Sequence, residues 1–238
     1  MSSLVSAIDR AWYPGYGRHW DDALFRQRVL AELRPDSIIL DLGAGAGIIP
    51  EMRFRGLAAR VCGVDLDSRV LDNPLLDEAW VADAGQVPYA DGYFDLVLCN
   101  NVLEHLAEPA RAFAEAARVL RPGGAFLFKT PNKWHYVATI SRLTGHGFHR
   151  YVNRRRGRAA RDTFPTLYRA NTAPAIARLA AGAGLQVESL EHIEGRPEYL
   201  RLAWPAYVLG AAYERLVNAT TLLAPFRVLF IGRLRKPA

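Results

Sequence analysis

The stretch IILDLGAGAG, residues 38–47, decides the fold of this chain. Its first five residues are apolar apart from one aspartate, and three glycines follow at alternate positions (Gly43, Gly45 and Gly47). A nearly continuous apolar run is typical of a strand buried in a parallel sheet, and glycines directly after it indicate a sharp turn. Because glycine has no Cβ, the backbone N–H groups of such a turn can come close to a ligand. The stretch therefore predicts a buried strand that ends in a ligand-binding turn.

Acidic residues lie at the ends of three successive strand-like runs: Asp41, Asp65 and Asp83. In an open α/β sheet the carboxyl ends of the strands share one edge, and ligands bind there. Asp65 lies 18 residues after Gly47, close to the offset of about 20 residues at which an acid binds ribose hydroxyls in dinucleotide folds. Any one of these acids has an alternative role as a helix cap. All three together indicate a single nucleoside-type ligand.

The rest of the chain alternates strand-like and helix-like segments, which predicts a mostly parallel sheet with helical crossovers. The strands are expected at 38–42, 60–65, 79–82, 94–99, 124–130, 185–193 and 226–234. We expect the last of them to pair antiparallel at the edge of the sheet. The helices are expected at 21–33, 45–55, 69–72, 109–120 and 173–183.

Length and composition fit one domain with a large core. We divide it into an N-terminal lid and helix (1–35), a ligand-binding core (36–132), a cap insertion (133–172) and a C-terminal core (173–238). Forty residues are too many for a structureless connection, so the cap is expected to be partly helical. The C-terminal core carries an apolar insertion, 197–225, whose longest uncharged run has 12 residues. Because a bilayer span needs about 20, we expect a packed helix, an acceptor channel or a peripheral membrane contact.

The net charge of +6 is concentrated in six arginines between residues 150 and 161. A solvated loop, a site for an anionic substrate and contact with an acidic membrane surface all remain open. Nucleic acid is an unlikely partner, because the patch is short and no nucleic-acid module accompanies it. Cys62 and Cys99 lie in apolar runs and are expected to be buried thiols, without disulfide or metal-ligand spacing. The first residues have no signal-peptide pattern, which predicts a cytoplasmic protein.

Four segments carry a family resemblance: LDLGAGAG (40–47), GVDLD (63–67), VADAGQVPYADGYFDLVLCNNVLEHL (81–106) and VLRPGGAFLFKTPN (119–132). They resemble the class I S-adenosylmethionine (SAM)-dependent methyltransferases, and the LEH triplet at 103–105 resembles the ubiquinone-pathway-like, small-molecule branch. The resemblance implies an α/β fold: a Rossmann-like, seven-stranded, mostly parallel sheet with an antiparallel last strand, plus a helical cap insertion. It also implies SAM as cofactor and S-adenosylhomocysteine as product.

A nicotinamide-dependent dehydrogenase is the alternative for a glycine-rich turn of this kind. Its fingerprint is G-x-G-x-x-G, whereas this chain has G-x-G-x-G. The third acid, Asp83, also favours SAM over NAD.

We assign cofactor contacts on the basis of these motifs. Asp41 is expected to attract the ammonium group of SAM, and Asp65 to accept from both ribose hydroxyls. Asp83 and the Ala84 N–H would bind the adenine edge, while Leu66 covers one face of the ring. The residues expected to contact the cofactor are Asp41, Gly43, Ala44, Gly45, Gly47, Asp65, Leu66, Asp83, Ala84, Asn100, Tyr16 and Trp20.

The catalytic candidates are His105, His146 and Tyr168. His105 follows the fourth strand, and a neutral imidazole there could take a proton from the acceptor, because imidazole ordinarily titrates near pH 6.5. A purely structural role for His105 is equally open. No metal and no covalent nucleophile is expected to be needed.

The predicted function is methyl transfer to a small-molecule acceptor, most readily an oxygen of a secondary metabolite, a glycan intermediate or a polar lipid. An RNA or protein methyltransferase is the first alternative and would favour a wide cationic face. A non-catalytic partner subunit with the same fold is the second. In such a non-catalytic subunit the glycine turn should be degenerate, whereas in this sequence the turn and all three acids are present.

Overall fold

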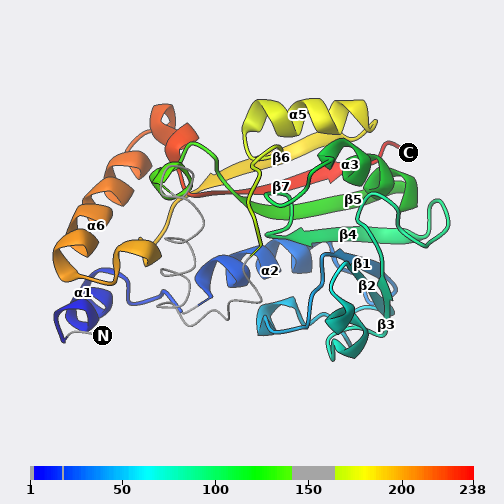
Figure 1. Ribbon diagram of the computed structural model, residues 1–238, viewed down its shortest axis with the longest axis horizontal. Helices are drawn as coiled ribbons and strands as arrows, with labels where there is room; N and C mark the ends of the chain where they lie inside the picture. The colour runs from blue at the N-terminus through cyan, green and yellow to red at the C-terminus, as the bar shows by residue number, and fades with distance from the viewer. Residues whose placement is uncertain (1–2, 18, 141–163) are drawn as a thin grey trace. The chain divides into compact units, whose positions relative to one another are not determined.

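The structure is a computed structural model that describes residues 3–17, 19–140 and 164–238 (Figure 1). The described chain divides into two compact units. We call Met1–Trp20, Pro131–Pro165 and His192–Leu229 the helical unit, and Asp21–Thr130, Thr166–Glu191 and Phe230–Ala238 the sheet unit. Candidate residue His146 lies outside the described residues, as does the arginine-rich segment 150–161.

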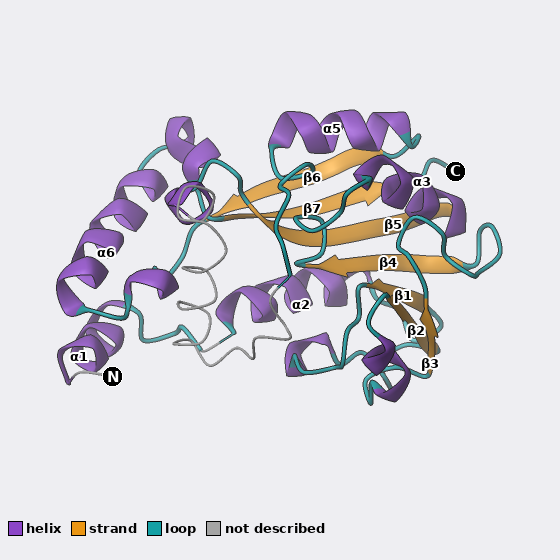
Figure 2. Cartoon of the chain, in the orientation of Figure 1, coloured by secondary structure: helices purple, strands orange, loops and turns teal. Residues whose placement is uncertain are grey.

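Within the described residues the sheet has seven strands in the order β3-β2-β1-β4-β5-β7-β6 (Figure 2). Apart from a few terminal residues, these strands belong to the sheet unit. Neighbouring strands from β3 to β5 pair in parallel. The bounds are β1 Ile38–Leu42, β2 Arg60–Asp65, β3 Glu78–Val81, β4 Phe94–Asn100, β5 Leu120–Pro131, β6 Gln186–Ile193 and β7 Leu229–Arg235. The predicted seven-stranded, mostly parallel sheet is confirmed.

The last strand, β7, runs antiparallel to β5, as predicted. Lys236, after the end of β7, donates its N–H to the carbonyl of Gly124 near the start of β5, at 2.9 Å. The predicted place of this strand at the edge was wrong, because β7 lies between β5 and β6, and β3 and β6 are the two edge strands of the sheet. A strand's hydrophobic pattern gives its buried faces and does not specify its neighbours.

The helices are α1 Ser3–Trp12, α2 Trp20–Glu32, α3 Pro109–Val119, α5 Ala173–Gly182 and α6 Trp204–Asn218. In the part of the chain that the structure describes, four short 3₁₀ helices accompany them: η1 Pro50–Met52, η2 Ser68–Asp72, η4 Glu198–Leu200 and η5 Thr221–Phe226. The helix expected at 45–55 is absent from this described segment, which contains only η1. Gly47 has a positive φ of 69° and Ile49 is extended. A residue before proline avoids the helical region, so the chain cannot begin a helix before Pro50.

The core of the sheet unit fixes the strands whose ends carry the candidate residues. Phe113 of α3 packs edge to face on Phe126 of β5, with ring centroids 5.5 Å apart. Both side chains are buried, as are Phe94 and Phe128. Burial of a side chain of this size contributes roughly 1.5–3 kcal/mol. Strands β4 and β5 are therefore held firmly beneath the loops that follow them.

The helical unit has a small core of its own around α1 and α6. Tyr13 and Tyr207 stack with ring centroids 5.8 Å apart, and the Tyr207 hydroxyl donates to Asp9 at 2.6 Å. Most of the apolar insertion forms α6. Among the described residues, no helix has both the length and the apolarity that crossing a membrane requires.

Candidate functional site

The glycine turn after β1 has a backbone path that side chains would obstruct. Gly43, Gly45 and Gly47 have φ values of 78°, 53° and 69°, in the left-handed region that favours glycine. A Cβ on Gly43 would overlap the side chain of Val102, and one on Gly47 would overlap that of Asn73. The turn therefore leaves bare backbone at the carboxyl end of β1, where a parallel sheet binds its ligands.

Two polar side chains hold this turn in place. The Asp65 Oδ2 atom accepts a hydrogen bond from the Gly45 N–H at 2.8 Å. Asn73, which is buried, donates from Nδ2 to the carbonyls of Ala44 and Gly45, at 3.1 Å each. Sequence reasoning missed Asn73, because an asparagine before a proline indicates only an ordinary turn.

Asp41 is a buried acid at the end of β1. It is 7% exposed, and no described residue donates a hydrogen bond to its carboxylate. Burial, followed by the nearby charge of Asp65, raises the pKa of Asp41 to about 7. A buried carboxylate without a partner is costly. This position therefore suits a cationic group of a ligand.

The three acids lie at or just after the carboxyl ends of three adjacent strands, β1, β2 and β3. Asp41 pairs in register with Gly63, and Asp65 pairs with Val81, two residues before Asp83. The acids consequently form a row along one edge of the sheet. Each Asp65 oxygen accepts one backbone N–H, from Gly45 and Asp67, at 2.8 Å. Because a carboxylate oxygen has two lone pairs, both can still accept from a ligand hydroxyl.

The expected adenine contacts lie at the exposed end of this row. Asp83 is exposed, and its Oδ1 accepts from the Gly85 N–H at 2.6 Å. Leu66, directly after β2, is 71% exposed. An apolar side chain so exposed beside a row of acids is available to cover a flat ligand. Ala84 is half-buried.

A buried charge cluster lies below the end of β4. Lys129 is fully buried and donates to Asp21 Oδ2 at 2.7 Å and to Asp22 Oδ1 at 2.6 Å. Asn100 donates to the same Asp22 oxygen at 2.8 Å. The Asn100 side chain is thus committed to α2, and its buried Oδ1 has no hydrogen-bond partner among the described residues.

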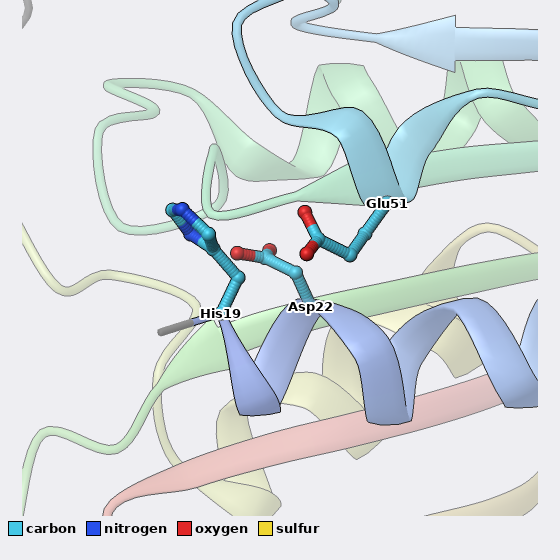
Figure 3. A group of neighbouring side chains, drawn as sticks. All are labelled: His19, Asp22 and Glu51. Atoms are coloured by element: carbon cyan, nitrogen blue, oxygen red, sulfur yellow. The ribbon is translucent and has the colours of Figure 1, made fainter. Parts of the chain in front are cut away.

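Figure 3 shows that the carboxylates of Asp22 and Glu51 face each other. Their nearest oxygens lie within 4.8 Å of one another. His19, also drawn, belongs to the helical unit. Asp22 and Glu51 belong to the sheet unit, and these two carboxylates are fewer than the three or four ligands of a typical zinc site. That the reaction needs no metal stays a prediction.

The loop after β4 carries the histidine candidate. Asn101 has a positive φ of 56°, and the His105 N–H donates to the Val102 carbonyl at 2.9 Å. The His105 side chain is 28% exposed. Its ring is therefore half-buried in the loop at the carboxyl end of β4.

Tyr168 approaches the same loop from the segment that precedes α5. Its N–H donates to the carbonyl of Glu104 at 3.1 Å, and its φ is 51°. Because the tyrosine is only 6% exposed, the ring is largely packed in the interior.

Tyr16 and Trp20 lie in the helical unit, with their rings 5.3 Å apart. The Arg196 guanidinium lies 5.9 Å from the Tyr16 ring centroid and donates to the carbonyls of Tyr16 and Gly17. A Cβ on Gly195 would overlap the Trp20 ring. These aromatic residues form a packed group with 195–196, and their contact with a cofactor stays a prediction.

Comparisons with known proteins agree with this geometry. A family model described as a methyltransferase domain matches residues 40–128. The chain is 30% identical to a ubiquinone biosynthesis O-methyltransferase of Thiobacillus denitrificans, over 82% of this chain and 90% of that protein. It is 35% identical to a malonyl-[acyl-carrier protein] O-methyltransferase of Hahella chejuensis, where the match covers 42% of this chain and only 41% of that protein. The second likeness is thus limited to part of each protein.

Among solved structures, the chain is similar to geranyl diphosphate C-methyltransferase from Streptomyces coelicolor, solved with Mg²⁺, geranyl diphosphate and S-adenosyl-L-homocysteine. The TM-score is 0.57 at 18% identity, covering 91% of this chain and 78% of that chain. At this identity the likeness concerns the fold alone.

Proposed function

The chain belongs to the class I SAM-dependent methyltransferases, and on this premise we propose that it methylates an oxygen of a small-molecule acceptor. The observation that carries the proposal is the glycine turn beside a row of three acids at the ends of β1, β2 and β3. Bare backbone, a buried acid without a partner and an acid with two available oxygens suit the amino-acid end and the ribose of SAM.

In the proposed arrangement each group of the site has one task. The turn binds the amino-acid end of SAM, Asp41 pairs with its ammonium group, and Asp65 accepts from the ribose hydroxyls. Asp83 and Leu66 bind the adenine. When bound, SAM supplies a methyl group on a sulfonium cation, which is already an activated electrophile. The protein then has to align the acceptor, exclude water and remove a proton.

An oxygen acceptor is supported by two observations. The relative matched over nine-tenths of its length is called an O-methyltransferase. His105 is half-buried at the end of β4, and an imidazole can act as the base that removes a hydroxyl proton. We test the acceptor class by following S-adenosylhomocysteine release with a catechol, an alkyl glycoside and a lysophospholipid. Release of S-adenosylhomocysteine with an oligonucleotide or a protein, but with none of these three small molecules, would contradict the proposal.

Replacing Asp65 by Ala is expected to weaken SAM binding by roughly 1–3 kcal/mol, because charge-assisted hydrogen bonds to the ribose are lost. The anchor of the Gly45 N–H is lost as well. Calorimetric titration measures the effect, with circular dichroism as the check on folding. Asp72→Ala, an exposed acid in the neighbouring η2, is the matched control and should bind SAM like wild type. Unchanged SAM affinity in Asp65→Ala would mean that Asp65 does not bind the ribose and has only a structural role in the turn.

A further inference from the structure

Glu104 is a buried acid next to His105 in the sequence, and the arrangement proposed above gives it no role. Its side chain is 7% exposed, and its Oε1 lies 3.8 Å from the Nε2 of His105. This separation is too long for a hydrogen bond and is typical of a charge pair. The two side chains are neighbours in sequence, yet Glu104 is buried whereas His105 reaches the surface.

A directed chain of hydrogen bonds fixes the Glu104 carboxylate. Asn171 donates from Nδ2 to the Thr130 Oγ1 at 2.7 Å, which commits the Thr130 hydroxyl hydrogen to another acceptor. That acceptor is Glu104 Oε2, at 3.1 Å. The Thr130 hydroxyl thus donates to Oε2, and Oε1 is the oxygen nearest the imidazole.

The backbone of Glu104 is fixed too. Its carbonyl accepts from the N–H groups of Leu167 and Tyr168, at 2.7 and 3.1 Å. These bonds join the loop after β4 to the segment before α5. A carboxylate held at both backbone and side chain can hold a neighbouring ring in one orientation.

The titratable groups that act electrostatically on Glu104, among the described residues, are His105, Lys129 and Cys99. Lys129 already binds Asp21 and Asp22, and burial raises the pKa of the Cys99 thiol, which keeps it neutral. Burial raises the pKa of the Glu104 carboxyl as well, while the charge of His105 opposes that rise. The imidazole is therefore the cation best placed to complement Glu104.

We propose that Glu104 is a positioning residue, whose carboxylate orients the His105 imidazole and stabilises the imidazolium formed when His105 takes the acceptor's proton. The inference rests on the proposed function. The proton moves from the acceptor oxygen to an imidazole nitrogen, and the oxygen's electron pair forms the C–O bond. The electron pair of the broken C–S bond remains on sulfur.

The first test needs no turnover. The ring signals of His105 are followed by NMR at constant pH in wild type, in Glu104→Gln and in Glu108→Gln. Glu108 is an exposed acid of the same loop and serves as the matched control. Loss of the Glu104 carboxylate should shift the His105 ring signals, because the imidazole loses the group that orients it, whereas Glu108→Gln should leave them at their wild-type positions. Unchanged ring signals in Glu104→Gln would overturn the inference.

A double-mutant cycle is the second test. Glu104→Gln should lower kcat by about 10–10²-fold in the wild-type background and hardly at all in the His105→Ala background, because the two residues act as one unit. Equal losses in both backgrounds would make Glu104 purely structural. If Glu104→Gln does not fold, Glu104→Asp replaces it, and the change in the His105 ring signals should then be smaller. Failure of SAM binding in calorimetry would refute the proposed function instead, and the NMR result would still decide the role of Glu104.

Discussion

Replacing Asp41 by Asn is expected to stabilise the folded protein and to weaken SAM binding at the same time. The carboxyl is buried at the end of β1, and its pKa is raised to about 7, first by burial and then by Asp65. An unfolded aspartate titrates near pH 4. Between these two pH values the folded state therefore holds a proton that the unfolded state has released.

The sign of the pH dependence follows from this difference. The Asp41 contribution to stability is fully present below about pH 4 and is lost as pH rises towards 7, a change of about 4 kcal/mol in the free energy of unfolding. Asn stays neutral, so Asp41→Asn should lack this loss and should be more stable than wild type above pH 7. Urea unfolding across this pH range measures the effect, and Asp72→Asn, at an exposed acid, is the control. Identical pH dependence in wild type and Asp41→Asn would disprove a raised pKa.

SAM binding should respond in the opposite direction. The ammonium group of SAM needs an ionised partner, so wild-type affinity should rise with pH through about 7. Asp41→Asn should bind SAM about 10–10²-fold more weakly above that pH, through loss of a charge-assisted contact. Calorimetry at two pH values measures both effects. Equal SAM affinity of wild type and Asp41→Asn at high pH would show that Asp41 does not bind the cofactor.

The second large effect is expected at His105. If its imidazole takes the acceptor's proton, His105→Ala should lower kcat by about 10²–10⁴-fold. SAM affinity should change little, because the loss concerns the transition state. Steady-state kinetics and calorimetry on both proteins provide the comparison. Nearly full kcat in the alanine variant would mean that His105 has a structural role, and Tyr168 and His146 would then be the remaining catalytic candidates.

Local patterns predicted the parts of the fold that depend on neighbouring residues. The apolar run 38–42 became β1, and the glycines after it adopt the left-handed conformations that a sharp turn needs. Asp41, Asp65 and Asp83 form one row because their strands are adjacent. The sequence implied this adjacency only through the resemblance to a known fold.

What sequence reasoning missed depends on contacts between distant segments. Asn73 holds the glycine turn from 28 residues away, and Asn171 acts on Glu104 through Thr130. The hydrophobic periodicity of a sequence does not reveal hydrogen bonds between residues that lie far apart in the chain. The helix expected at 45–55 does not form for a local reason. Gly47 has a positive φ, and Ile49 is extended because it precedes a proline. Helix α1 was not predicted either, because the only helix expected in the N-terminal segment 1–35 was the one at 21–33.

The most direct measurement is a calorimetric titration of the wild-type protein with SAM, S-adenosylhomocysteine and NAD, at a pH above the Asp41 pKa of about 7. If the glycine turn and the row of three acids hold the cofactor, SAM and S-adenosylhomocysteine should each bind at a single site, and NAD should give no binding heat. Binding of NAD, with none of either adenosyl compound, would contradict the assignment of this site.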